Sequence, residues 1–214
     1  MERFKNIPDA KKYDFFSDCH HGGVNPKSVK LEFGKDKVHL QDNVEVVRVP
    51  KRDSSAAIAR YLSYVNDMVK TGTHFVSDNH AGRHSKGPYF KILDGHILIT
   101  HGHCLWKDKT RKKWANKEAG SWWGQMIFSR IISRGRHLIK KTKLKDKEIS
   151  KLLYFKKKAE VEHLAETGHG VHIDTVVLGH THPNCLIDVI VDGIRYVNVM
   201  EGKTTLYFKR IKNG

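Results

Sequence analysis

The chain has little cysteine, little proline and no long hydrophobic run, and each shortage argues against a class of protein. Its three cysteines, an odd number at scattered positions, do not indicate a disulfide framework and fit a reducing compartment. No stretch of about 20 uninterrupted apolar residues exists, which argues against a membrane-spanning helix. With only 5 prolines and 39% hydrophobic residues in 214, the composition is that of one globular domain.

The first residues lead directly into polar sequence and contain no apolar signal segment. We therefore expect a cytoplasmic protein, with peripheral attachment to a membrane surface as the alternative location.

Acidic residues are scarce in one segment. The whole chain has 39 Lys or Arg and 23 Asp or Glu, a net charge of +16. Residues 107–158 contain 18 of the basic and 4 of the acidic residues (+14), so the remaining 21 and 19 give only +2. This asymmetry predicts a substrate or partner that is an anion larger than one phosphate, such as nucleic acid or an acidic membrane surface.

What the sequence does contain is five short segments in which residues able to bind metal ions follow apolar runs. The segments are Asp18-Cys19-His20, Asp42-Asn43, Asn79-His80, His101-Gly102-His103 and Gly179-His180-Thr181-His182. Together they supply enough carboxylate, amide and imidazole groups for two metal ions about 3.5–4 Å apart, the arrangement that hydrolyses phosphate esters.

Hydrophobic periodicity places these segments after predicted strands. Strands are expected at 12–17, 37–40, 73–76, 97–99, 175–178 and 204–209, with hairpins turning at Asp94-Gly95 and Asp192-Gly193. Helices are expected at 54–68, in 122–139 and at 146–166. Because α/β sheets carry their functional loops at the carboxyl ends of strands, the candidate ligands are expected to meet there.

The order D-x-H, D-N-x-x-E, N-H, H-G-H, G-H-x-H, between about Tyr13 and Met200, resembles that of the calcineurin-like metallophosphoesterases. The resemblance implies an α/β fold with two mixed β-sheets packed as a sandwich flanked by helices, a four-layer αββα arrangement. Residues 1–214 would form one such domain, and 104–170 would be a basic helical insertion within it, a candidate lid.

The resemblance also implies the metal ligands. Asp42 would bridge two ions. The other ligands fall into two sets, one of Asp18, His20 and His182 and one of Asn79, His101 and His180. Mixed carboxylate and imidazole ligation favours Mn²⁺, with Fe, Zn, Ni or Co as alternatives.

The implied reaction is hydrolysis of a phosphodiester or pyrophosphate bond by a hydroxide that bridges the two metals. His80 would protonate the leaving oxygen, and Glu45 would orient His80. Candidate substrate contacts are His103, Arg83 and Arg48.

Three positions depart from the family pattern. Gln41 and Asp78 stand where Gly usually precedes Asp and Asn-His, and Ala81 replaces an acidic residue. Because Gly permits a positive φ, we expect both loops to be shifted. Every implied metal ligand is present, so an active metal site is still expected.

Two alternatives remain open. D-N-x-x-E and the insertion, with Trp122 and Trp123 among its lysines, are similar to the branch that hydrolyses UDP-diacylglucosamine pyrophosphate, although His103 replaces an acidic residue there. The chain would otherwise be a metal-containing nucleic-acid-binding or nuclease module. The apolar stripe of the insertion is equally compatible with an ordinary helix–helix core.

Overall fold

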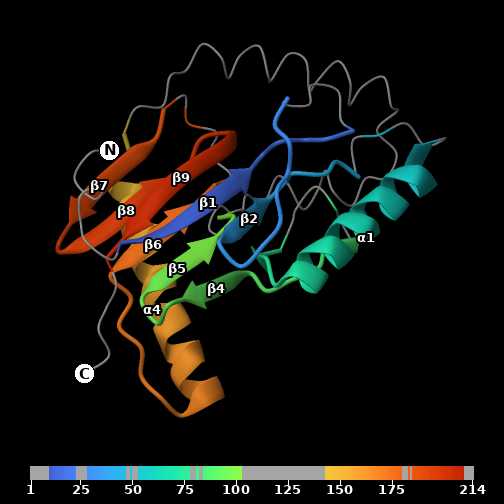
Figure 1. The fold of residues 1–214 in the computed structure, drawn as a ribbon. Coiled ribbons are helices and arrows are strands. Elements are labelled where there is room, and N and C mark those ends of the chain that lie inside the picture. Colours follow the sequence, from blue (N-terminus) through green and yellow to red (C-terminus); the bar gives the residue numbers. More distant parts are fainter. Residues whose placement is uncertain are drawn as a thin grey trace.

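A computed structural model describes residues 10–22, 28–46, 49, 53–77, 81, 84–102, 143–179, 183 and 185–209. Within these ranges the chain forms two β-sheets and two helices (Figure 1). No helix in the described ranges is long and apolar enough to cross a membrane.

The first sheet has four strands in the order β3-β2-β1-β9. These are β1 (Lys11–Ser17), β2 (Lys37–Gln41), β3 (His74–Phe75) and β9 (Gly202–Phe208). β1, β2 and β3 run parallel, and β9 pairs antiparallel with β1, so the sheet is mixed.

The second sheet has five strands in the order β4-β5-β6-β8-β7. These are β4 (Phe90–Leu93), β5 (Ile97–Thr100), β6 (Thr175–Leu178), β7 (Ile187–Val191) and β8 (Ile194–Asn198). The three central strands are parallel and both edge strands antiparallel. Asp192 and Gly193, at φ 51° and 75°, form the two-residue turn that their sequence predicts.

The two sheets share one hydrophobic core, because a single cluster of buried side chains takes residues from both. Tyr13 and Phe15 of β1 lie in it together with Ile97 and Ile99 of β5 and Val177 of β6. A continuous apolar layer between the sheets is compatible with a sandwich.

Each outer face is covered by a helix. α1 (Ser54–Thr71) packs through Tyr61, Tyr64 and Met68 beside the first sheet, and α4 (Asp146–Thr167) packs on the second. Both helices end at a left-handed glycine, Gly72 or Gly168, as glycine at that position favours.

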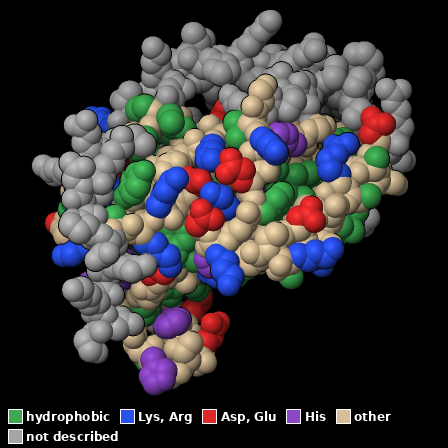
Figure 2. Space-filling model, in the orientation of Figure 1, with side chains coloured by type: hydrophobic (Ala, Val, Ile, Leu, Met, Phe, Trp, Pro, Cys, Tyr) green, Lys and Arg blue, Asp and Glu red, His purple; other side chains and the backbone are tan. Residues whose placement is uncertain are grey.

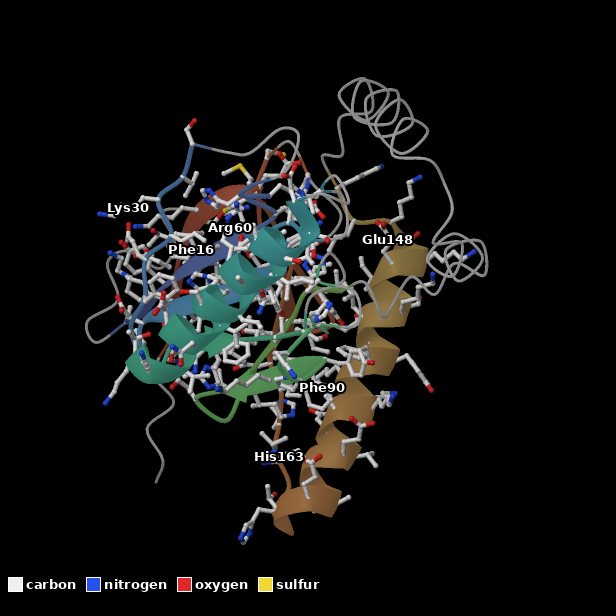
Figure 3. All side chains as sticks on the ribbon, turned by 90° about the vertical axis from the view of Figure 1, so that its right-hand side faces the viewer. Phe16, Lys30, Arg60, Phe90, Glu148 and His163 are labelled. Atoms are coloured by element: carbon white, nitrogen blue, oxygen red, sulfur yellow. The ribbon has the colours of Figure 1, made fainter. Side chains whose placement is uncertain are left out.

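The packing of α4 restricts which residues of 104–170 the lid interpretation still applies to. Leu152 and Phe155 of α4 join one cluster with Val176 and Tyr196 of the sheet, and the ring of Phe155 lies edge-on to that of Phe90, 5.8 Å between centroids. Figure 3 shows Phe90 beside α4. This helix is therefore a layer of the core. The lid interpretation of 104–170 stays a prediction for residues 104–142, which lie outside the described part.

On the face of the molecule seen in Figure 2, basic and acidic side chains are interspersed. Oppositely charged side chains pair among the described residues: Lys37 Nζ lies 2.7 Å from Asp14 and 2.9 Å from Asp36. This mixture agrees with the near neutrality of the chain outside 107–158. The α/β class with two mixed sheets is confirmed.

Candidate metal centre

The register of β1 and β2 brings Asp18 and Asp42 together at one edge of the first sheet. Ser17 pairs with Gln41, so the residue after each strand is a carboxylate. Backbone hydrogen bonds continue past the strands, from Asp18 N–H to Gln41 O and from His20 N–H to Asp42 O, each 3.0 Å. The two ligand loops are thereby joined along their length.

The second sheet delivers its loops to the same place. Thr100 of β5 pairs with Leu178 of β6, and the next residues are His101 and Gly179. A Cβ added to Gly179 would lie 2.2 Å from Ser17 Oγ and 3.4 Å from Asp18 Oδ2. Only a glycine therefore lets the start of the G-H-x-H segment approach Asp18 so closely.

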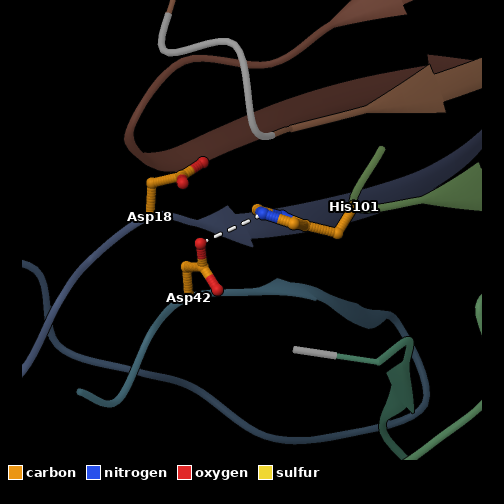
Figure 4. Close-up of side chains that lie close together, drawn as sticks. All are labelled: Asp18, Asp42 and His101. Carbon is orange, nitrogen blue, oxygen red and sulfur yellow. Dashed lines mark ion pairs between the residues drawn. The ribbon is translucent and has the colours of Figure 1, made fainter. Parts of the chain in front are cut away.

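Asp18, Asp42 and His101 form a buried cluster, each about 1% exposed. One ligand atom from each lies within 4.8 Å of the others, and His101 Nε2 is 3.1 Å from Asp42 Oδ2 (Figure 4). Ser17 Oγ donates a 2.5 Å hydrogen bond to Asp18 Oδ2, which fixes that carboxylate.

The charge of this cluster fits a cation. Burial lowers the pKa of His101, but the adjacent carboxylates of Asp42 and Asp18 outweigh it, so the pKa of His101 is raised. Even with His101 protonated, two carboxylates leave a net negative charge in a buried site, which is costly without a counter-ion.

The donor atoms also fit a metal ion. Carboxylate oxygens and an imidazole nitrogen bound at about 2.1 Å from one ion would lie about 3–4 Å apart. His101 Nε2 and Asp42 Oδ2 are 3.1 Å apart, and one ligand atom of each of the three residues lies within 4.8 Å of the others. The Asp18, Asp42 and His101 group could therefore hold a metal ion.

The loops that carry the cluster are conformationally strained. Four residues other than glycine have a left-handed backbone: Asp18 at φ 53°, His20 at 52°, Gln41 at 78° and Asp42 at 53°. Such residues cost about 1–2 kcal/mol each. This strain persists only where surrounding contacts impose it, and it is common at functional sites.

Gln41, directly before Asp42, combines a strained backbone with a buried side chain. It adopts the positive φ that a glycine would adopt freely, and its fully buried amide has no hydrogen-bond partner among the described residues. The backbone before Asp42 is therefore left-handed although glutamine disfavours that conformation.

Glu45 lies near the imidazole of His20, and its predicted partner His80 lies outside the described residues. Its Oε2 is 3.6 Å from Nδ1 of His20, and Glu45 is 2% exposed. This separation is longer than a hydrogen bond. His20 itself is not part of the three-residue cluster, and its role as a ligand stays a prediction.

The remaining predicted site residues lie outside the described part, so their roles stay predictions. They are Arg48, Asp78, Asn79, His80, Arg83, His103, His180 and His182. Ala81, by contrast, is described and is buried with α1 side chains.

Sequence reasoning missed one cation beside the ligand loops. A Cβ added to Gly22, two residues after His20, would lie 1.9 Å from Arg60 Nη1, so the Arg60 side chain lies against this loop. Arg60 is exposed and forms no hydrogen bond or ion pair with any described residue. The spacing of α1 alone gives no sign of this contact.

A comparison of the chain with protein-family models found no match, and a search of curated proteins found none at a significant level.

Proposed function

We propose that the chain is a calcineurin-like metallophosphoesterase that uses two divalent metal ions to hydrolyse a phosphodiester or pyrophosphate bond. The observation that carries this proposal is the convergence of Asp18, Asp42 and His101, from both sheets, into one buried cluster. The order of the five sequence segments supports it, because three of the five contribute to that cluster.

The position of Asp42 supports its assignment as the bridging ligand. Asp18 and His101 are assigned to different ions, and Asp42 lies in one cluster with both. His20 and His182 would complete the first set of ligands, and Asn79 and His180 the second. We propose Mn²⁺ as the ion, with Fe, Zn, Ni or Co as alternatives that this mixture of oxygen and nitrogen donors also suits.

Metal ions bound here would activate a water as nucleophile near neutral pH and offset the charge of the phosphoryl oxygens. The chain itself orients the ligands: Ser17 holds Asp18, and Glu45 lies against His20. In this proposal His80 donates a proton to the leaving oxygen.

The substrate we propose is an anion with more than one charged group. The support is the +14 balance of residues 107–158, together with the exposed Arg60 beside the ligand loop, which has no ion-pair partner among the described residues. A lipid pyrophosphate and a nucleic-acid strand both have this character, and liposome and oligonucleotide assays separate them.

The test is hydrolysis of bis-p-nitrophenyl phosphate by metal-stripped protein after Mn²⁺ is added back. We expect turnover that requires Mn²⁺ and falls at least 100-fold in Asp42→Asn, whose fold is checked by circular dichroism. Turnover without metal, or unchanged in Asp42→Asn, would contradict the proposal. Oligonucleotide binding without any turnover would favour the nucleic-acid-binding alternative.

A further inference from the structure

Asn43, the residue after Asp42, is fully buried and joins its own loop to the loop that carries Asp18. Its side-chain Oδ1 accepts a 3.4 Å hydrogen bond from Cys19 N–H, and its Nδ2 donates one of 3.2 Å to Phe16 O. Phe16 and Cys19 lie on either side of the Ser17-Asp18 pair. One amide therefore ties the backbone around Asp18 to the residue that follows Asp42.

The orientation of this amide is fixed by its partners. A backbone N–H can only donate and a backbone C=O can only accept, so the oxygen must face Cys19 and the nitrogen Phe16. The second hydrogen on Nδ2 is donated to Tyr64 Oη of α1, at 3.1 Å.

The chain of hydrogen bonds continues in one direction. With its oxygen accepting from Asn43, the Tyr64 hydroxyl donates to His39 Nδ1 at 2.6 Å, and His39 Nε2–H donates to the Glu32 carbonyl at 2.9 Å. His39 is thus the neutral tautomer with its proton on Nε2. Burial lowers the pKa of His39 to about 4, and Phe16 and Phe33 stack on its ring at 4.9 and 5.5 Å.

We infer that Asn43 is a positioning residue for the metal centre, held in place by Tyr64 and His39. This inference rests on the proposed metal-dependent function. Asp18 and Asp42 have a strained, left-handed backbone. The hydrogen bonds of Asn43, which follows Asp42, hold the chain on both sides of Asp18. The two carboxylates are therefore placed before a metal binds, and part of the cost of bringing them together is offset by the fold.

The test is Mn²⁺ affinity, measured by titration calorimetry on the full chain. Asn43→Leu keeps the side-chain size and removes all three hydrogen bonds, and we expect it to weaken Mn²⁺ binding about 10- to 100-fold. Tyr64→Phe removes one hydroxyl and should weaken binding less, about 3- to 10-fold. At saturating Mn²⁺ both variants should keep the wild-type KM for bis-p-nitrophenyl phosphate.

Leu152→Ala is the matched control, because Leu152 is fully buried on α4 in a different cluster. It should lower thermal stability without changing Mn²⁺ affinity. The tautomer supplies a second readout: ¹⁵N shifts in the wild type should report His39 protonated on Nε2, and Tyr64→Phe should move the Nδ1 resonance but keep this tautomer, because the Glu32 carbonyl still accepts from Nε2.

Wild-type Mn²⁺ affinity in both Asn43→Leu and Tyr64→Phe would overturn the inference, as would a loss of affinity no greater than that of Leu152→Ala. A wild-type chain that binds no Mn²⁺ would instead overturn the metal centre itself. The two failures are therefore distinguishable.

Discussion

At the scale of single residues, Gln41 combines two unfavourable features: a left-handed backbone and a buried amide without a hydrogen bond among the described residues. Gln41→Gly and Gln41→Ala both remove the amide, but only glycine relieves the backbone strain. We expect the glycine variant to exceed the alanine variant in free energy of unfolding by about 1 kcal/mol, measured by urea denaturation. Equal stabilities would mean that this position carries no strain.

His39 makes stability depend on pH. Its pKa is about 4 in the fold, because of burial, against 6.5 when unfolded, so the unfolded chain binds more protons between these values. Stability should therefore be complete above pH 6.5 and fall as the pH drops toward 4, by about 3 kcal/mol from this residue alone.

His39→Gln removes the titrating ring and should flatten that slope. Urea denaturation at pH 7 and pH 4.5 gives the loss of unfolding free energy for each protein. The difference between wild type and variant is the contribution of His39, because the other titrating groups largely cancel. The same loss of stability in both proteins would refute the assignment of a neutral, buried His39.

At the scale of elements, the site depends on where strand ends meet. The two sheets approach so closely at Gly179 that a Cβ would overlap Ser17 Oγ. Gly179→Ala should displace Asp18 and lower both Mn²⁺ affinity and turnover at least tenfold. Gly170→Ala is the control, because an added Cβ there meets nothing within 4 Å. Equal activity in the two variants would mean that this close approach does not position Asp18.

The sequence predicted most of these elements and part of the site. Strands such as Thr175–Leu178 and the turn at Asp192-Gly193 follow from local patterns, and so do Asp18, Asp42 and His101 as residues after strands. The contacts between elements that tertiary packing sets could not be predicted from the sequence. Periodicity gives α4 an apolar face but does not say that this face covers a sheet.

The contacts of Asn43 were missed for the same reason. In sequence, Asp42-Asn43 reads as a turn, and only the parallel pairing of β1 and β2 brings Phe16 and Cys19 to its amide. Arg60 likewise meets Gly22 through the packing of α1, which no spacing along the chain predicts.

At the scale of the whole molecule, the charge distribution predicts strong salt dependence for large anions. With +14 of the +16 net charge in residues 107–158, binding of a single-stranded oligonucleotide should weaken at least tenfold between 50 and 200 mM salt. Bis-p-nitrophenyl phosphate carries only one charge, so the rate of its hydrolysis should change less than about twofold over the same range of salt. Fluorescence anisotropy and the colorimetric assay measure the two. Salt-independent binding would contradict an electrostatic role for this segment.

The most direct test of the central claim is anomalous scattering from crystals of the Mn²⁺-loaded protein. The account predicts two manganese peaks about 3.5–4 Å apart, one within ligand distance of Asp18 and Asp42 and the other within ligand distance of Asp42 and His101. No peak at these side chains, or manganese bound only elsewhere, would contradict it.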